Sequence, residues 1–164
     1  MHPALKHALS QVKDAPAIHL EAAAPDYPQL IARHLPAKAH VICDIHTKRV
    51  LPFPTLCFSE PPKPTQEIVA RIRAETAGAE ALIAVGSGTI NDLVKYAAFL
   101  DGKPYAVIAS APSMNGYVSA NASILMGGAK QSLAARGPVA VLADLPTLCS
   151  APLPLIQAGI GDTL

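Results

Sequence analysis

Four short stretches of the chain are apolar at nearly every position, and amphipathic segments separate them. They occupy residues 39–44, 81–85, 105–110 and 139–144. A strand that faces solvent on one side alternates apolar and polar residues, whereas a strand covered on both sides is apolar throughout. The pattern therefore predicts an α/β fold, with a doubly wound, mostly parallel sheet covered by helices on both faces.

Two helices are expected between these strands. Thr65 is a suitable N-cap for a helix over residues 66–76, because its hydroxyl can accept a hydrogen bond from a free backbone N–H. Gly78 is a suitable residue to end that helix. A second helix is expected over residues 89–100, directly after a glycine turn.

Two extended segments are expected outside the centre of the sheet. Residues 50–58 contain two prolines, which cannot donate to a ladder of hydrogen bonds, so the sequence disfavours a central strand there. Residues 121–134 carry Gly127 and Gly128 at their midpoint. Paired glycines between β-prone residues predict a β-hairpin insertion.

The remaining segments lie at the two ends of the sequence. Residues 1–38 are rich in alanine, histidine and proline and are expected to form two short helical pieces. Residues 39–151 form the expected α/β domain. Residues 152–164 are expected to start a helix that the chain does not finish.

The composition fits a folded domain without a polyanionic partner. The chain has 164 residues, of which 51% are hydrophobic and 15% charged, and a net charge of +1. It has no cluster of basic residues, so neither a nucleic acid nor an anionic membrane is expected as a partner. No stretch is long and apolar enough to span a membrane, and no signal-peptide pattern is present, so a cytoplasmic protein is expected.

The cysteines do not indicate a disulfide framework or a zinc knuckle. Cys43, Cys57 and Cys149 are odd in number and widely spaced, with no Cys-x-x-Cys pair. Each lies in an apolar stretch, so buried structural thiols are expected.

A glycine turn between a strand and a helix is the strongest local signal for chemistry. It reads Val-Gly-Ser-Gly-Thr-Ile-Asn-Asp over residues 85–92. Glycine lets a backbone approach a phosphate, and the free N–H groups at a helix start attract its charge. The motif is not the dinucleotide fingerprint Gly-x-Gly-x-x-Gly, because Asn91 takes the last position, and it lacks the lysine of a P-loop. On its own it indicates either a phosphate site or simply a good turn.

Two acidic residues end strands, and each has two interpretations. Asp44 could accept hydrogen bonds from the hydroxyls of an adenosine ribose, or it could stabilise the turn that follows the strand. Asp144 is followed closely by Pro146, which favours the turn interpretation.

A loop dense in hydroxyl and amide groups follows the third apolar stretch. It reads Ser-Ala-Pro-Ser-Met-Asn-Gly-Tyr-Val-Ser over residues 110–119. Open α/β sheets bind ligands at the carboxyl ends of their strands. The loop is therefore a candidate site, although many serine-rich loops have no such role.

Three motifs together resemble one known family. They are Gly-Ser-Gly-Thr-Ile-Asn-Asp-Leu-Val-Lys at 86–95, Ala-Pro-Ser-Met-Asn-Gly-Tyr at 111–117 and Ala-Gly-Ile-Gly-Asp at 158–162. In this order they resemble the glycerol-1-phosphate dehydrogenase branch of the superfamily of iron-containing alcohol dehydrogenases, glycerol dehydrogenases and 3-dehydroquinate synthases. The resemblance runs from about residue 38 to the last residue, and it implies a Rossmann-like nucleotide-binding domain.

The resemblance also implies roles for individual residues. The turn over residues 86–90 matches the pyrophosphate loop of NAD or NADP, and the serines of the next loop match contacts to the nicotinamide half. Asn115 matches a substrate position that is often aspartate, and Asp162 matches a carboxylate that binds both substrate and a divalent metal. With Asp44, the expected cofactor-binding residues are Gly86, Ser87, Gly88, Thr89, Ile90, Ser110, Ser113 and Ser119.

The sequence departs from the family at the metal site. Relatives complete that site with two histidines from a helical C-terminal domain, whereas all six histidines here precede residue 47. One carboxylate cannot hold zinc, iron or nickel, which usually need three or more protein ligands. We therefore expect a fragment that lacks the helical domain and is inactive by itself, with an apolar surface at residues 153–160 that favours self-association and leaves a homo-oligomer possible.

The function implied for the whole enzyme is hydride transfer between NAD(P) and a phosphorylated polyol, glycerol 1-phosphate or dihydroxyacetone phosphate. Asp44 would repel a 2′-phosphate and so favours NAD over NADP. Another member of the superfamily, such as a glycerol dehydrogenase or a dehydroquinate synthase-like enzyme, is one alternative. A nucleotide-binding module without catalysis is the other.

Overall fold

A six-stranded parallel sheet forms the centre of the protein, whose computed structural model describes residue 7 and residues 15–164. The order across the sheet is β1-β8-β5-β4-β2-β3, and every neighbouring pair is parallel. The strands are β1 (Ala17–Glu21), β2 (Ala39–Asp44), β3 (Thr55–Phe58), β4 (Ala81–Gly86), β5 (Tyr105–Ala109) and β8 (Ala140–Asp144). The doubly wound sheet expected from the four apolar stretches is confirmed.

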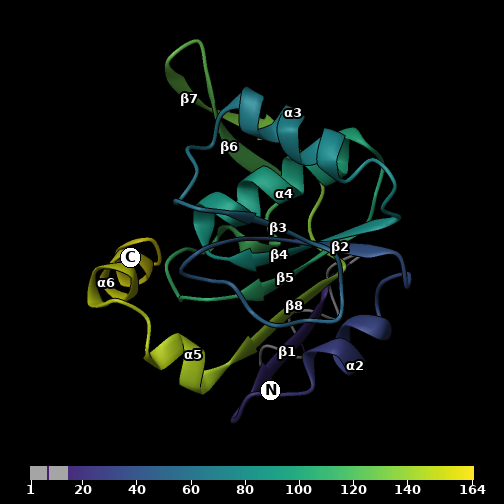
Figure 1. Ribbon diagram of the computed structural model, residues 1–164. Coiled ribbons are helices and arrows are strands. Elements are labelled where there is room, and N and C mark those ends of the chain that lie inside the picture. The colour runs from purple at the N-terminus through teal and green to yellow at the C-terminus, as the bar shows by residue number, and fades with distance from the viewer. Residues whose placement is uncertain (1–6, 8–14) are drawn as a thin grey trace.

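Helices cover both faces of this sheet (Figure 1). On one face lie α3 (Gln66–Glu75) and α4 (Gly88–Leu100), and on the other lies α2 (Tyr27–Ala32). Side chains alternate along each strand, so each face builds its own apolar cluster. Because both faces are covered, the central strands are apolar at nearly every position.

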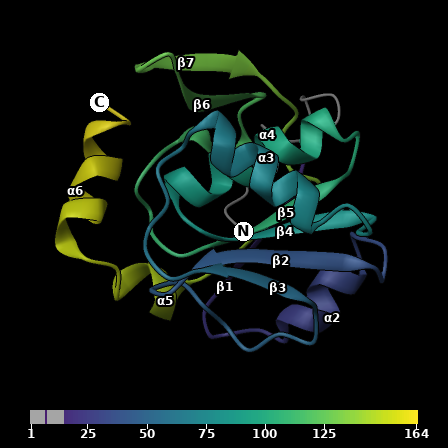
Figure 2. The same ribbon diagram turned by 45° about the horizontal axis from the view of Figure 1, so that its top comes forward.

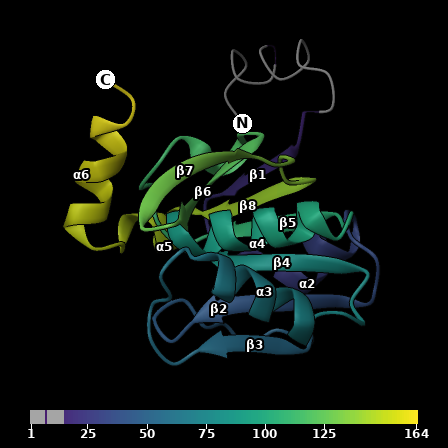
Figure 3. The same ribbon diagram turned by 90° about the horizontal axis from the view of Figure 1, so that it is seen from above.

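The expected hairpin forms a separate two-stranded sheet of β6 (Asn121–Met126) and β7 (Ala129–Ala134). Gly127 and Gly128 join the strands with φ angles of 58° and 83°, which residues other than glycine rarely adopt. Ala122 and Ile124 are buried in the same apolar cluster as α3 and α4. The hairpin therefore lies over these helices, as Figure 3 shows.

The chain continues beyond β8 through two helices, α5 (Leu145–Cys149) and α6 (Leu153–Gly161). In Figure 2, α6 stands to one side of the sheet, beyond the ends of the central strands. The helix expected from residue 152 is thus present, and it ends at Gly161. Among the described residues, no helix combines the length and apolar character needed to cross a membrane.

The start of α3 and the position of the edge strand β3 both follow from the local sequence. Thr65 caps α3 by accepting a hydrogen bond from the Ile68 backbone N–H at 3.5 Å, as expected. β3 pairs only with β2 and lies at the edge of the sheet, which agrees with the prolines that precede it.

Two expectations about local structure are wrong in part. The sequence predicts two helical pieces within residues 1–38, and α2 is a helix in that segment, but residues 17–21 form β1, and residues 1–6 and 8–14 lie outside the described part. β1 forms because its backbone pairs with β8, a partner more than a hundred residues away that local propensity does not reveal. Cys149 is exposed at the end of α5 and Cys57 is only half-buried, whereas Cys43 is buried as expected.

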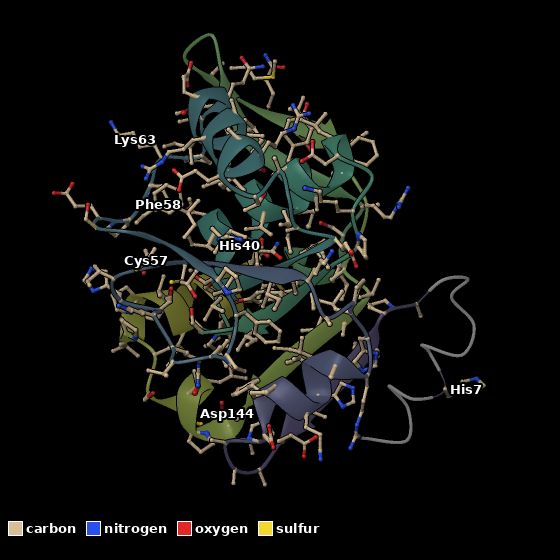
Figure 4. The ribbon with its side chains drawn as sticks, turned by 45° about the vertical axis from the view of Figure 1, so that its right-hand side comes forward. His7, His40, Cys57, Phe58, Lys63 and Asp144 are labelled. Carbon is tan, nitrogen blue, oxygen red and sulfur yellow. The ribbon has the colours of Figure 1, made fainter. Side chains whose placement is uncertain are left out.

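Asp144, the last residue of β8 (labelled in Figure 4), joins α2, α5 and the segment after β2. Its carboxylate accepts hydrogen bonds from the Tyr27 hydroxyl at 2.5 Å and from the Thr147 backbone and hydroxyl, and Arg49 lies 3.8 Å away. Burial alone raises the pKa of Asp144, but these partners together hold it below its usual value. Asp144 also caps α5, so the turn interpretation of this residue is confirmed.

A pair of histidines joins β1 to the end of α2 and makes the stability of this region depend on pH. His19 and His34 share a hydrogen bond of 2.9 Å between their Nε2 atoms, which requires one ring to donate and the other to accept. Burial, followed by the nearby His19 and Arg33, lowers the pKa of His34 below 6.5. The unfolded chain therefore binds a proton more readily than the folded chain, and stability falls as the pH falls below about 6.5.

We expect the thermal midpoint of the wild-type protein to fall more between pH 7.5 and pH 5.5 than that of the His34→Gln variant. Glutamine has no proton to take up in this range, so this contribution to the pH dependence disappears. Thermal unfolding followed by circular dichroism at both pH values measures the difference. Equal falls in the two proteins would contradict a role for His34.

Candidate functional site

A cavity of about 480 Å³ opens at the carboxyl end of the sheet. Its lining comes from the start of α4, the loop over residues 113–119, the hairpin and α6, together with Pro64. Figure 2 shows how these four segments are arranged. The cavity brings together seven residues singled out from the sequence, which are Ser87, Gly88, Thr89, Ser113, Asn115, Ser119 and Asp162. Motifs that lie up to 75 residues apart in the chain therefore share one site.

The glycine turn divides into a structural part and an exposed part. Gly86 ends β4, and a Cβ atom there would lie 2.7 Å from Cβ of Ile90, which is itself buried. These two residues pack the strand against the helix. In contrast, Ser87 and Gly88 line the cavity, and a Cβ on Gly88 would meet only Sδ of Met114, at 3.5 Å.

The start of α4 is left open toward this cavity. Ser87 occupies the N-cap position but makes no side-chain hydrogen bond to the helix. The first backbone N–H groups of a helix have no partner within the helix and carry a partial positive charge. The turn therefore offers donors and positive potential where a phosphate could bind.

Asp162 and Asn115 both line the cavity and are hydrogen-bonded to each other. The Asp162 carboxylate accepts a bond from the Asn115 backbone N–H at 2.7 Å, and the Asn115 amide donates to the Asp162 carbonyl at 3.1 Å. These two bonds attach the end of α6 to the loop. The two residues that the sequence assigned to substrate are thus held side by side.

Close packing brings α6 onto the same loop. A Cβ atom on Gly159 would lie 1.7 Å from the carbonyl oxygen of Pro112, so only glycine allows this approach. Gly161, two residues later, has nothing within 4 Å of a Cβ. The glycines in the motif over residues 158–162 therefore have different roles.

Lys95 secures the other side of the loop, and sequence reasoning assigned it no role. Its side chain is fully buried, and Nζ donates to the Gly116 carbonyl at 2.8 Å, the Asn121 carbonyl at 3.0 Å and Oγ of Ser119 at 3.1 Å. Burial lowers the pKa of Lys95, and Asp92, 3.7 Å away, acts in the opposite direction. The spacing of Asp92 and Lys95, three residues apart on one helix, is the signal that could have identified this pair.

Asp92 connects α4 to the hairpin. Its Oδ2 accepts a hydrogen bond from the Ser123 backbone N–H at 3.0 Å, and its side chain lines the cavity. The hairpin is therefore fixed relative to the glycine turn by a carboxylate and relative to the loop by Lys95. Asp92 and Lys95 both belong to α4, so this one helix positions the loop and the hairpin relative to each other.

Four expected cofactor residues do not line this cavity, namely Asp44, Gly86, Ile90 and Ser110. Oδ1 of Asp44 accepts hydrogen bonds from the His46 backbone at 2.9 Å and the Thr47 backbone at 3.0 Å, so it stabilises the turn after β2. The backbone of Ser110 donates to the Gly86 carbonyl at 3.1 Å. Gly86, Ile90 and Ser110 instead contact one another at the ends of β4 and β5, beside the cavity-lining Ser87.

The residues at this site do not form a complete metal centre. Within the described part of the chain, no group of three or more histidine, cysteine, aspartate or glutamate side chains is placed to hold a metal ion. Asp162 offers one carboxylate to the cavity. A metal bound there would need further ligands from outside these residues.

Known proteins resemble this chain in sequence over its central part. The family model for iron-containing alcohol dehydrogenases matches residues 53–152. A glycerol-1-phosphate dehydrogenase of Bacillus licheniformis, named as using NAD(P)+, is 39% identical over 99 residues, covering 60% of this chain and 25% of that protein. The corresponding protein of Sulfurisphaera tokodaii is 47% identical over 83 residues, covering 51% of this chain and 24% of that protein. The matches thus cover about a quarter of each relative.

Solved structures show the same fold. A probable glycerol dehydrogenase from Sinorhizobium meliloti superposes with a TM-score of 0.79 at 23% identity, covering 90% of this chain and 44% of that one. A 2-deoxy-scyllo-inosose synthase has a TM-score of 0.69 at 18% identity, covering 87% and 46% of the two chains. The fold agrees with the family identified by sequence, whose model spans more than half of this chain. The chain belongs to the iron-containing alcohol dehydrogenase family.

Proposed function

We propose that this chain is the cofactor-binding part of an NAD(P)-linked glycerol-1-phosphate dehydrogenase. The observation that carries the proposal is the single cavity shared by the open start of α4, the serine-rich loop and Asp162. The family model matches residues 53–152, which include most of the residues that line the cavity, and the relatives named for this reaction match 60% and 51% of the chain. The reaction itself belongs to the whole enzyme, of which this chain matches a part.

The cofactor would bind with its pyrophosphate at the turn formed by Ser87, Gly88 and Thr89. The open backbone N–H groups of α4 would donate to it, and the missing side chain at Gly88 gives the phosphate room. Ser113 and Ser119 would contact the nicotinamide half. When bound, NAD(P) supplies the hydride acceptor or donor for the reaction.

The ribose of the adenosine half would extend toward the end of β2. Asp44 lies there with Oδ1 engaged in the turn and is 8% exposed. Its second carboxylate oxygen, Oδ2, could accept from ribose hydroxyls, and its charge would oppose a 2′-phosphate. We therefore propose NAD as the preferred cofactor.

The substrate would lie between the nicotinamide site and α6. This placement is supported by Asp162 and Asn115, which both line the cavity, are hydrogen-bonded to each other and can bond to the hydroxyls of a polyol. The 2-deoxy-scyllo-inosose synthase with this fold is complexed with carbaglucose-6-phosphate, NAD+ and Co2+. A phosphorylated polyol beside NAD is thus the ligand combination that we propose, with metal ligands completed outside the described residues.

Replacing Gly88 tests the cofactor site. We expect the Gly88→Ala variant to bind NADH at least about tenfold more weakly than the wild-type chain, because the new methyl group occupies space that the pyrophosphate needs. Its fold should be unchanged, since the methyl group meets only the flexible end of Met114. Isothermal titration with NADH and NADPH measures both affinities.

The Gly78→Ala variant is the matched control. Gly78 follows α3, and a Cβ there would have nothing within 4 Å. This variant should bind NADH like the wild type. No saturable binding of either cofactor by the folded wild-type chain would contradict the proposal, and equal affinities in wild type and Gly88→Ala would contradict the placement of the pyrophosphate.

A further inference from the structure

The hairpin presents one polar face to the cavity. Side chains alternate along each strand, and the register pairs Ser123 with Ser132 and Leu125 with Lys130, so these four share a face. The opposite face carries Ala122 and Ile124, which are buried against the helices. Of the polar face, Ser123, Lys130 and Ser132 line the cavity.

Lys130 is the one cationic side chain among the described residues that line this cavity. The two acidic residues that line it are Asp92 and Asp162, so without Lys130 the charged side chains lining the cavity would all be carboxylates, which repel a phosphate. Lys95 lies close by, but its Nζ is buried and donates to three oxygen atoms of the loop. Lys95 is therefore not available to a ligand.

The ammonium group of Lys130 is free to bind a ligand. In the part of the chain that the structure describes, its Nζ takes part in no hydrogen bond or ion pair. Ser132 lies on the same face, and its Oγ accepts from the Asn121 amide at 3.0 Å, which leaves the hydroxyl proton able to donate. A free cation and a free hydroxyl donor therefore face the same space.

We propose that Lys130, with Ser123 and Ser132, forms a subsite for the phosphate monoester of the substrate. The glycine turn, at the start of α4, would bind the cofactor's pyrophosphate, so the two phosphate groups would have separate sites on two different elements. Lys130 would then be the residue that distinguishes a phosphorylated polyol from a free one. This inference rests on the proposed function, because it assumes that the cavity binds both ligands.

The hairpin is well suited to this task because its position is fixed. The glycines at its tip set the register, and Asp92 and Lys95 bind its first strand to α4. Because the register of β7 is fixed, Lys130 lies on the face of the hairpin that lines the cavity. Its charge would also confer a dependence on ionic strength, since salt screens exposed charges.

The test compares glycerol 1-phosphate, glycerol and NADH as ligands of the full chain. In the Lys130→Met variant we expect about tenfold weaker binding of glycerol 1-phosphate, the value of one charge-assisted contact, with NADH affinity within about twofold of wild type. Lys130→Arg should restore most of the affinity. Isothermal titration or ligand-induced shifts in nuclear magnetic resonance spectra measure these values.

Lys38→Met is the control for loss of a surface charge. Lys38 is exposed, pairs with Glu80 at 3.5 Å and precedes β2 at the other end of the sheet. It should leave every ligand affinity unchanged. Glycerol should bind equally weakly to all of these proteins, because it carries no phosphate.

Three results would overturn the proposal. The first is that Lys130→Met binds glycerol 1-phosphate as tightly as the wild type does. The second is that Lys130→Met loses as much affinity for NADH as for glycerol 1-phosphate, which would assign Lys130 to a phosphate of the cofactor. The third is that the wild type does not bind glycerol 1-phosphate. Failure of the proposed function gives a different result, since the wild-type chain would then not bind NADH. Binding of glycerol 1-phosphate that depends on Lys130 would support the subsite even in that case.

Discussion

Substituting Gly159 by alanine is expected to detach α6 from the rest of the protein. The new Cβ would lie 1.7 Å from the Pro112 carbonyl oxygen and 2.8 Å from the carbonyl carbon. Both are backbone atoms, so no side-chain rotation relieves the overlap, and either the helix or the loop must move. The helix is the part that moves, because the loop is held from its other side by Lys95.

Movement of α6 removes the hydrogen bonds between Asp162 and Asn115. The bond from the Asn115 backbone N–H to the Asp162 carboxylate is charge-assisted, and such bonds contribute roughly 1.5–3 kcal/mol. An isolated helix shorter than about 12 residues is marginal in water. Because α6 has 9 residues, it should lose much of its helical structure once it is no longer packed against the loop.

Hydrogen exchange followed by mass spectrometry measures this effect. In Gly159→Ala we expect amide protection to fall at least about tenfold over α6 and at Asn115, while β4 and β5 keep theirs. Gly161→Ala is the matched control in the same helix, where a Cβ meets nothing within 4 Å. Alanine favours a helix over glycine by about 1 kcal/mol, so protection there should stay equal or rise. Unchanged protection of α6 in Gly159→Ala would show that the close approach to Pro112 is not required.

The central sheet could be predicted from the sequence because burial on both faces leaves a local signature. Strands such as β4 and β5 are buried at every position, and their sequences are continuously apolar. β1 has no such signature. Its residues are only partly buried, and its pairing partner β8 lies far along the chain, so its sequence is equally compatible with a helix.

The parts of the site that are formed by backbone could be predicted from the sequence. The turn at Gly86 and Gly88 and the loop after β5 follow strands, and the carboxyl ends of parallel strands meet at one edge. Which residues line the cavity depends on side-chain packing instead. Ile90 points into the core, and Asp44 points into its own turn, and neither direction can be read from spacing alone.

Lys95 and Lys130 are site residues that were not predicted from the sequence. Lysine is almost never fully buried, so the pattern of the chain gives no reason to expect Lys95 inside the protein. It is buried because the loop and the hairpin cover α4, and its ammonium satisfies carbonyls of both. Lys130 is exposed, as usual for lysine, and only the register of the hairpin places it at the cavity.

Replacement of Lys95 by methionine is expected to destabilise the protein and to open the site. Methionine has a similar length but no donor, so the carbonyls of Gly116 and Asn121 lose a buried partner. Both carbonyls can still accept a hydrogen bond from the Ser119 hydroxyl, so what is lost is the bonds from a charged donor, which contribute roughly 1.5–3 kcal/mol each. The free energy of unfolding should therefore fall by about 3 kcal/mol or more, measured by urea denaturation.

The loss of ligand affinity should exceed the effect of lower stability alone. Lys95 joins the loop to the hairpin through Gly116, Ser119 and Asn121, so its removal lets both move away from the start of α4. At a temperature where the variant remains folded, we expect NADH to bind at least about tenfold more weakly. Titration below the thermal midpoint separates this effect from unfolding.

Lys103→Met provides the matched comparison for Lys95→Met. Lys103 follows the other end of α4, is largely buried and donates to the Thr76 carbonyl at 2.8 Å, so its loss also removes a buried donor. It should lower stability by about 1 kcal/mol and leave NADH affinity unchanged, because it contacts neither the loop nor the hairpin. If both variants weaken NADH binding equally, stability rather than positioning explains the loss. If only Lys95→Met weakens it, the buried ammonium positions the loop, and a charge that touches no ligand controls the shape of the site.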